Sequence, residues 1–167
     1  TLDLGGIAKG YIIDQGVAIL EEKGIKTAFL NAGGDIKILG SKPDGTSWRV
    51  GIQSPQKNSG LLAVLNLKGG AVATSGNYER FFEEKGVSYH HILDPKTGYP
   101  ARGLAGVTIT APDCMTADAL STAVFVLGLE KGLDFIESFP QSEAVLVTEE
   151  GSIYYSSGLE GLLELQD

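Results

Sequence analysis

The sequence has little that could hold it together covalently or anchor it in a membrane. Its 167 residues include one cysteine, Cys114, so no disulfide can form within the chain. No stretch approaches the roughly 20 apolar residues that a membrane-spanning helix needs. The opening segment TLDLGGIAKG lacks the basic and apolar regions of a signal peptide. Because this segment leads straight into a helical pattern, we expect the chain to start inside a longer protein.

Basic residues are also scarce. Lysine and arginine number 13 against 21 acidic residues, which gives a formal net charge of -8 and a pI of about 4.7. A chain with no basic stripe cannot neutralise the phosphates of DNA or RNA, so we expect no nucleic-acid partner. An anionic small ligand is still allowed, because a bound divalent cation and a few lysines set the local field of a pocket.

What the chain does have is enough apolar residues, at 43%, to fill one core, and it has no internal repeat or linker. We therefore expect a single domain over residues 1–167. Apolar periodicity predicts helices over 7–23, 116–127 and 129–139. Strands are predicted over 27–30, 35–39, 48–53, 61–67, 71–73, 89–93 and 104–110, with a closing hairpin of 144–148 and 153–155. This order favours an α+β fold with a mainly antiparallel sheet packed with helices.

Glycine is abundant, at 23 residues, and gathers in clusters beside polar residues. The first cluster lies in DLGGIAKGYIID, from Asp3 to Asp14, where two glycines precede a helix that carries Lys9. Free N–H groups at a helix start, together with a lysine, suit a phosphate or pyrophosphate. A glycine-rich helix entry with a solvated lysine explains the segment equally well. The segment is neither a Walker loop nor a GxGxxG motif.

Two further segments join strand-like runs. NAGGD, Asn31 to Asp35, has the composition of an ordinary hairpin turn. In ATSGNYERFF, Ser75 and Gly76 offer hydroxyl and backbone donors, and Tyr78 offers a ring to a planar ligand. An edge turn with core aromatic residues accounts for the second segment as well.

Both histidines of the chain lie in HHILDPKTGYP, from His90 to Pro100. Neighbouring residues of a strand face opposite sides, so at most one of them points into a given pocket. A histidine there can act as general base for a hydroxyl nucleophile, because its ordinary pKa lies near neutrality. The alternative is a strand histidine that is exposed or hydrogen-bonded without any catalytic role. The DPKTG stretch predicts a turn, with Asp94 or Thr97 as a capping residue.

A candidate cation site lies in PDCMTADALSTA, residues 112–123. Asp118 and Thr122 are four residues apart on one helix face, so their oxygens can meet one hard cation. Mg²⁺ takes six ligands, and a further protein ligand must come from another segment. The alternative is a polar pair near a helix start, with Asp118 at the positive end of the helix dipole.

Together the segments DLGGIAKGYIID, NAGGD, ATSGNYE, HHILDPKTGYP and TADALSTAVFVLG, in this order, resemble the ApbE family of flavin transferases. The resemblance extends from Asp3 to at least Gly128 and implies the family's α+β, T-fold-like architecture. Family members carry a further N-terminal portion that supplies part of the flavin and adenosine pocket. The resemblance therefore implies the C-terminal, metal-binding portion of such an enzyme.

The resemblance also implies roles for individual residues. The backbone carbonyl of Gly6 matches a magnesium ligand, and Asp118 and Thr122 match the other protein ligands. His91 is the candidate base, with Asp94 orienting the turn or the ring, and His90 is the weaker candidate. The residues implied in binding the flavin nucleotide are Asp3, Lys9, Gly33, Gly34, Asp35, Ser75, Gly76, Tyr78 and Ile92.

The activity that the resemblance implies is Mg²⁺-dependent transfer of FMN from FAD to a threonine hydroxyl of an acceptor protein, with release of AMP. Two alternatives stay open: hydrolysis of FAD to FMN and AMP, and flavin binding without turnover. The partners expected are FAD and an acceptor protein that carries a threonine flavinylation motif. By family analogy we expect a periplasmic or otherwise extracytoplasmic enzyme, lipid-anchored through a segment outside this chain.

Overall fold

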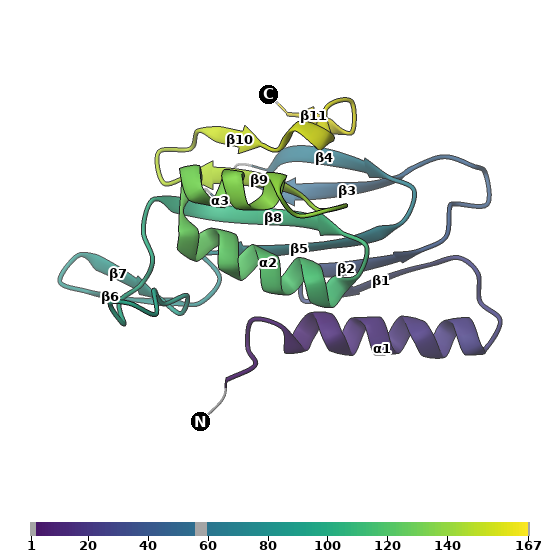
Figure 1. Ribbon diagram of the computed structural model, residues 1–167, viewed down its shortest axis with the longest axis horizontal. Coiled ribbons are helices and arrows are strands. Elements are labelled where there is room, and N and C mark those ends of the chain that lie inside the picture. The colour runs from purple at the N-terminus through teal and green to yellow at the C-terminus, as the bar shows by residue number, and fades with distance from the viewer. Residues whose placement is uncertain (1–2, 56–59, 167) are drawn as a thin grey trace.

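The computed structural model describes residues 3–55 and 60–166, which form three layers (Figure 1). The helices are α1 (Ala8–Glu22), α2 (Cys114–Leu127) and α3 (Leu129–Glu137), with a short 3₁₀ turn, η1 (Ser157–Leu159). The strands are β1 (Ala28–Ala32), β2 (Asp35–Leu39), β3 (Trp48–Gln53), β4 (Leu61–Leu67), β5 (Gly70–Gly76), β6 (Phe81–Glu84), β7 (Val87–His90), β8 (Leu104–Ala111), β9 (Glu143–Thr148), β10 (Ile153–Tyr155) and β11 (Leu163–Leu165).

The central layer is a six-stranded sheet in the order β1-β2-β5-β8-β9-β10, and every neighbouring pair in it is antiparallel. A second sheet, β11-β4-β3, packs against one face, and the helices cover the other. Among the described residues, β6 and β7 form a two-stranded sheet of their own, and this hairpin projects from the body of the molecule (Figure 1). The predicted α+β fold with a mainly antiparallel sheet is confirmed.

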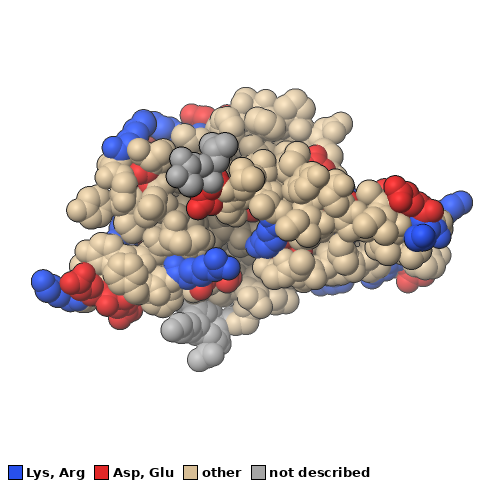
Figure 2. Space-filling view, turned by 90° about the horizontal axis from the view of Figure 1, so that it is seen from below, with Lys and Arg blue, Asp and Glu red and all other residues tan. Residues whose placement is uncertain are grey.

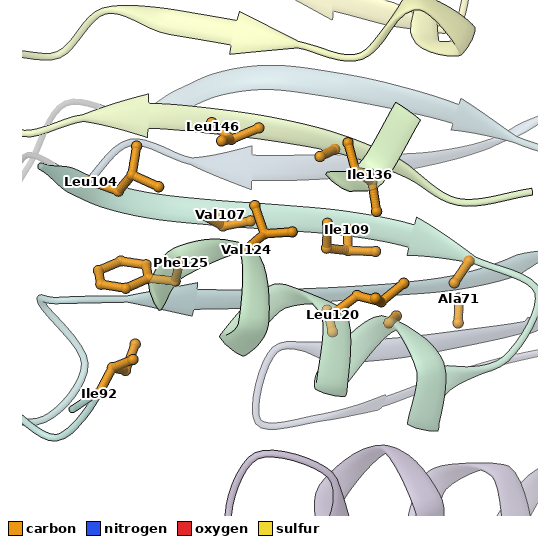
Figure 3. Close-up of a cluster of buried hydrophobic side chains, with 14 of the residues drawn as sticks. Ala71, Ile92, Leu104, Val107, Ile109, Leu120, Val124, Phe125, Ile136 and Leu146 are labelled. Carbon is orange, nitrogen blue, oxygen red and sulfur yellow. The ribbon is translucent and has the colours of Figure 1, made fainter. Parts of the chain in front are cut away.

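Side-chain alternation along the central strands builds two cores. On β5, Ala71 and Ala73 face the helices, whereas Val72 faces the second sheet. Figure 3 shows the core on the helical side, where Val124 and Phe125 of α2 lie over the central sheet. This packing holds α2 directly against β5 and β8, so that residues of the helix and of β5 are brought together.

The structure corrects several predicted boundaries. The strand predicted over 89–93 is wrong at its end: β7 stops at His90, and Leu93 makes only an isolated bridge with Pro100. Helix α2 begins at Cys114, before the predicted start, because the Asp113 carboxylate accepts from the Thr116 N–H and caps it. Strands β6 and β11 were not predicted. No helix within 3–55 and 60–166 is long and apolar enough to cross a membrane.

Candidate functional site

A cavity of about 1040 Å³ opens where α1, the β1–β2 turn, β5, the base of the β6–β7 hairpin and α2 meet. Every predicted site residue except Asp35 and Asp94 lines it. The face seen in Figure 2 is hollowed near its middle, with basic side chains beside the hollow. A second cavity, of about 330 Å³, lies among β3, β4, β8 and β9 and is lined by none of the predicted residues.

One wall of the large cavity is a pair of helices that cap each other. The first N–H groups of a helix have no partner within it. In α1 the Gly10 N–H donates to Asp118 Oδ2 of α2 at 3.0 Å. In return, the Asp14 carboxylate of α1 accepts from the N–H groups of Cys114 and Met115 at the start of α2, at 2.9 and 2.8 Å. These bonds fix where the Asp118 carboxylate lies.

The helices can approach this closely because residue 10 is glycine. A Cβ atom at Gly10 would lie 2.3 Å from the carbonyl oxygen of Cys114, closer than atoms can pack. Cys114 itself is buried at this contact, and burial raises the pKa of its thiol to about 12. The thiol therefore stays protonated and has no part in the chemistry of the cavity.

The three predicted cation ligands meet at this wall. Asp118 is 6% exposed, and its Oδ1 accepts no hydrogen bond from any residue that the structure describes. A Cβ atom at Gly6 would lie 3.2 Å from Thr122 Oγ1, so the Gly6 backbone is next to that hydroxyl. Ser75 Oγ lies 3.3 Å from Thr122 Oγ1. A carboxylate, a hydroxyl and a backbone carbonyl are hard oxygen donors of the kind that Mg²⁺ prefers.

This set contains only one carboxylate. Accordingly, the described part of the chain holds no group of three or more His, Cys, Asp or Glu side chains placed to bind a metal. Mg²⁺ commonly binds through one or two carboxylates and completes its shell with waters and substrate phosphates. The donors present therefore suit Mg²⁺ bound together with a phosphorylated ligand, and they do not suit a zinc site of nitrogen and sulfur ligands.

Above the cation ligands, Lys9 of α1 reaches the turn between β1 and β2. Its Nζ lies 3.0 Å from Asp35 Oδ1 and donates to the Gly33 carbonyl at 3.3 Å. Asp35 is only 1% exposed, and its burial raises the pKa of the carboxyl to about 6. Lys9 opposes this rise in the pKa, and the negative charge of Asp118 adds to it. Asp35 was predicted to be among the nucleotide-binding residues. It does not line the cavity, because its side chain lies beneath the cavity surface.

A different wall is formed by Tyr78, whose ring lies across the end of β5. A Cβ atom at Gly76 would lie 2.5 Å from Tyr78 Cε1, so only glycine leaves room for the ring there. Burial raises the pKa of the Tyr78 hydroxyl, which stays protonated at neutral pH. The ring therefore presents an uncharged, planar surface to the cavity.

The two histidines have separate environments. His90 is 3% exposed, its Nε2 bonds the Ala101 carbonyl at 2.9 Å, and its burial lowers the pKa of the ring. His91 lines the cavity, and its Nδ1 lies 3.2 Å from the Arg80 carbonyl. A carbonyl can only accept, so Nδ1 carries the proton and Nε2 of the neutral ring is left as a base.

Asp94 does not touch this ring. Its carboxylate accepts from the Lys96 N–H at 2.8 Å, and its backbone closes a turn with Gly98 and Tyr99. Asp94 thus shapes the loop behind His91, while the Arg80 carbonyl orients the imidazole. The predicted role for Asp94 at the ring has no support in this geometry.

Sequence reasoning passed over Gly10, Asp14 and Arg80. The first two lie four residues apart on one helix face, but this spacing alone does not indicate a contact with a second helix. Arg80 acts through its backbone carbonyl, which any residue has, so its side chain carried no signal.

Comparison with known proteins gives a consistent result. The model of the ApbE family matches residues 1–146. An FAD:protein FMN transferase of Treponema pallidum is 40% identical over 168 residues, covering 95% of this chain and 46% of that protein. One of Klebsiella pneumoniae is 39% identical over 158 residues, covering 93% of this chain and 48% of that protein. The chain thus spans about half the length of these curated relatives.

Solved structures are similar over the same extent. An ApbE protein of Thermotoga maritima is 45% identical with a TM-score of 0.90, covering 97% of this chain and 53% of that one. A flavin transferase ApbE of Vibrio cholerae is 33% identical with a TM-score of 0.83, covering 96% of this chain and 52% of that one. The fold and the sequence pattern therefore point to the same relatives.

Proposed function

The chain belongs to the ApbE family, and on that premise we propose that it carries the cation-binding part of an FAD:protein FMN transferase. The observation that carries this proposal is the convergence of two groups on one cavity. The oxygens of Gly6, Asp118 and Thr122 lie on the wall formed at α1 and α2, the helical wall. The candidate base His91 lies on the wall at the base of the β6–β7 hairpin, the hairpin wall. Transfer of a phosphoryl group to a hydroxyl needs both a cation at the phosphates and a base at the hydroxyl.

The cation in this proposal is Mg²⁺, held by Asp118, Thr122 and the Gly6 carbonyl. When bound, it neutralises the charge that develops on the pyrophosphate as AMP departs. The Lys9 ammonium adds a positive charge on the same side of the cavity. This local charge explains how a chain with a net charge of -8 takes an anionic substrate.

The hydroxyl in this proposal belongs to a threonine of an acceptor protein. His91 Nε2 takes its proton as the threonine oxygen bonds to the phosphorus of the FMN moiety. The bond from that phosphorus to the AMP oxygen breaks, and AMP leaves with the electron pair. The Tyr78 ring offers a flat surface for an aromatic part of FAD. We further propose that the whole protein works outside the cytoplasm, lipid-anchored through a segment beyond this chain.

The test is incubation of the whole protein that contains this chain with FAD, Mg²⁺ and an acceptor protein that carries a threonine motif, followed by intact-mass measurement of the acceptor and assay of AMP. We expect a mass gain of one FMN and an equal amount of AMP. Asp118→Ala should abolish both, whereas Asp134→Ala, the same change at an exposed position of α3, should leave both unchanged. His91→Ala should stop transfer and leave FAD binding largely intact.

Other outcomes identify the alternatives. AMP and free FMN without a mass gain would show that water replaces the threonine hydroxyl, which makes the chain a hydrolase. FAD binding without AMP would show a flavin-binding domain without turnover. Full activity in Asp118→Ala would remove the proposed cation site.

A further inference from the structure

Among the residues that the structure describes, Asp35 is the buried carboxylate next to the cavity that the proposed chemistry does not use. We propose that Asp35 is a positioning residue, which holds the Lys9 ammonium so that one of its N–H groups points to an anionic group of the bound nucleotide. This inference rests on the proposed function, because it takes a phosphorylated ligand as the occupant of the cavity.

The contacts of Lys9 leave one donor free. An ammonium group has three N–H donors and no acceptor. Within the described chain, one contact of Nζ is with Asp35 Oδ1 at 3.0 Å and another is with the Gly33 carbonyl at 3.3 Å. Since Lys9 lines the cavity and its side chain is 43% exposed, the third N–H is open to a ligand oxygen.

Asp35 itself cannot take part by direct contact. It is 1% exposed, it is the first residue of β2, and it does not line the cavity. Its Oδ2 is buried and has no hydrogen-bond partner among the residues that the structure describes. A buried carboxylate is costly unless it is paired, so Asp35 and Lys9 hold each other in place. Any effect of Asp35 on a ligand must therefore pass through Lys9.

The second anchor of Lys9 is also rigid. Gly33 and Gly34 have φ angles of +61° and +94°, as a tight hairpin turn of this kind requires. The Asn31 side chain accepts from the Gly34 N–H at 3.1 Å and closes the turn from within. The Gly33 carbonyl is thus fixed in space, and Lys9 is held at two points. A lysine fixed before binding loses less side-chain entropy when the ligand arrives.

Positioning and simple electrostatics predict opposite effects of one variant. Asp35→Asn keeps the shape of the side chain but removes its negative charge. If the carboxylate only weakens the field of Lys9, the variant should bind an anion more tightly. If the carboxylate orients Lys9, the variant should bind the anion more weakly, because the ammonium regains its rotamer freedom.

The experiment is a double-mutant cycle on the full chain, with FAD as the probe and its fluorescence as the readout. We expect Lys9→Met to bind FAD about tenfold more weakly than the wild type, because it loses about one charge-assisted hydrogen bond. Asp35→Asn should bind FAD about fivefold more weakly, because it loses part of that bond. The double variant should bind no more weakly than Lys9→Met alone. Lys131→Met, the same change at an exposed lysine of α3, should bind as the wild type does.

A second arm of the cycle needs no ligand. At about pH 8, Lys9→Met leaves the Asp35 carboxylate unpaired, and we expect the unfolding temperature to fall by about 5 °C. In the Asp35→Asn background the same change should have almost no effect. If Lys9→Met lowers the unfolding temperature equally in both backgrounds, Asp35 and Lys9 are not an ion pair. The inference is then overturned, whatever the FAD-binding measurement gives.

The remaining outcomes separate this inference from the proposed function. If the pair couples in unfolding but Asp35→Asn binds FAD as tightly as the wild type or more tightly, Asp35 is only structural and the positioning role is overturned. If the wild-type protein, with the whole flavin pocket present, binds no FAD, the proposed function fails first. The positioning role falls with it, because Lys9 then has no nucleotide to meet.

Discussion

The two walls of the cavity are built in opposite ways. The helical wall is continuous with the core, since Gly10 packs on the backbone of Cys114 and Asp118 is 6% exposed. The hairpin wall is formed at the base of β6–β7, which is a separate two-stranded sheet in the described part of the chain and whose β6 residues are all exposed. Figure 1 shows this hairpin projecting from the layers that hold the helices.

The difference matches the task that we propose for each wall. A small cation needs oxygens at nearly fixed positions, and a buried, mutually capped pair of helices supplies them. A protein acceptor needs an approachable surface, and the exposed hairpin leads directly to His91. Three changes can break or sharpen this contrast, and they are taken from the largest expected effect to the smallest.

The first change is Gly10→Ala in the helical wall. The added methyl group would overlap the Cys114 carbonyl at 2.3 Å, and this neighbour is backbone, so the two helices must separate. We expect a loss of about 3 kcal/mol in the free energy of unfolding, the upper range for overpacking a core. Urea denaturation measures it. Mg²⁺ binding should weaken too, because the Gly10 N–H no longer reaches Asp118.

Gly16→Ala is the matched control on the same helix. A Cβ atom there would meet only the Leu30 Cδ2 atom, at 3.2 Å, and a leucine side chain can shift. Since alanine favours helix over glycine by up to about 1 kcal/mol, this variant should be as stable as the wild type or more stable. Equal losses at both positions would show that the helix contact is not special.

The second change is Asp35→Asn, followed by urea denaturation at about pH 4 and about pH 7.5. The pKa of Asp35 is raised from 3.8 to about 6, so the folded state binds this proton more tightly than the unfolded state does. The wild type therefore loses stability through Asp35 as the pH rises from about 4 to about 6. The asparagine variant lacks this loss.

We thus expect the free energy of unfolding of Asp35→Asn, relative to the wild type, to rise by about 2 kcal/mol between the two pH values. The charged groups that act on Asp35 are Lys9, which opposes the shift, and Asp118, which adds to it. A relative stability that does not change with pH would show that Asp35 has an ordinary pKa and is better solvated than its burial indicates.

The same contrast explains what the sequence could predict. The two helices of the helical wall were predicted to within two residues of their bounds, because helix periodicity is a local feature, while the cation roles of Asp118 and Thr122 stay predictions. The strands of the hairpin wall were predicted less well. Strand β6 has the sequence FFEE, with no alternation of apolar and polar residues, and no local signal marks the end of β7 at His90. Long-range contacts, such as Gly10 with Asp118, depend on packing that one-dimensional patterns do not encode.

The site shows the same limit. Asp35 was placed among the nucleotide-binding residues from the NAGGD motif, and only the structure shows it buried behind Lys9. Asp94 was expected from the resemblance to orient the turn or the His91 ring, and its carboxylate bonds the Lys96 N–H within the turn. In both cases the residue type was informative, but the direction of the side chain was decided by the turn around it.

The third and smallest change is Phe82→Ser in the hairpin. Phe82 stacks on Tyr89 across the strands with a centroid distance of 5.2 Å, yet it is 62% exposed. A cross-strand aromatic pair contributes about 0.5 kcal/mol, and within the residues that the structure describes the hairpin is not part of a larger sheet. We expect the urea midpoint to stay nearly constant while the amide hydrogens of β6 and β7 exchange faster.

The control is Phe82→Tyr, which keeps the stacked ring and whose amide hydrogens should exchange as those of the wild type do. In Phe82→Ser, Mg²⁺ binding should not change, because the ligands that we propose for it lie on the other wall. If Phe82→Ser lowered stability as much as Gly10→Ala does, the hairpin would be part of the same cooperative unit as the helices, and the two walls would not differ.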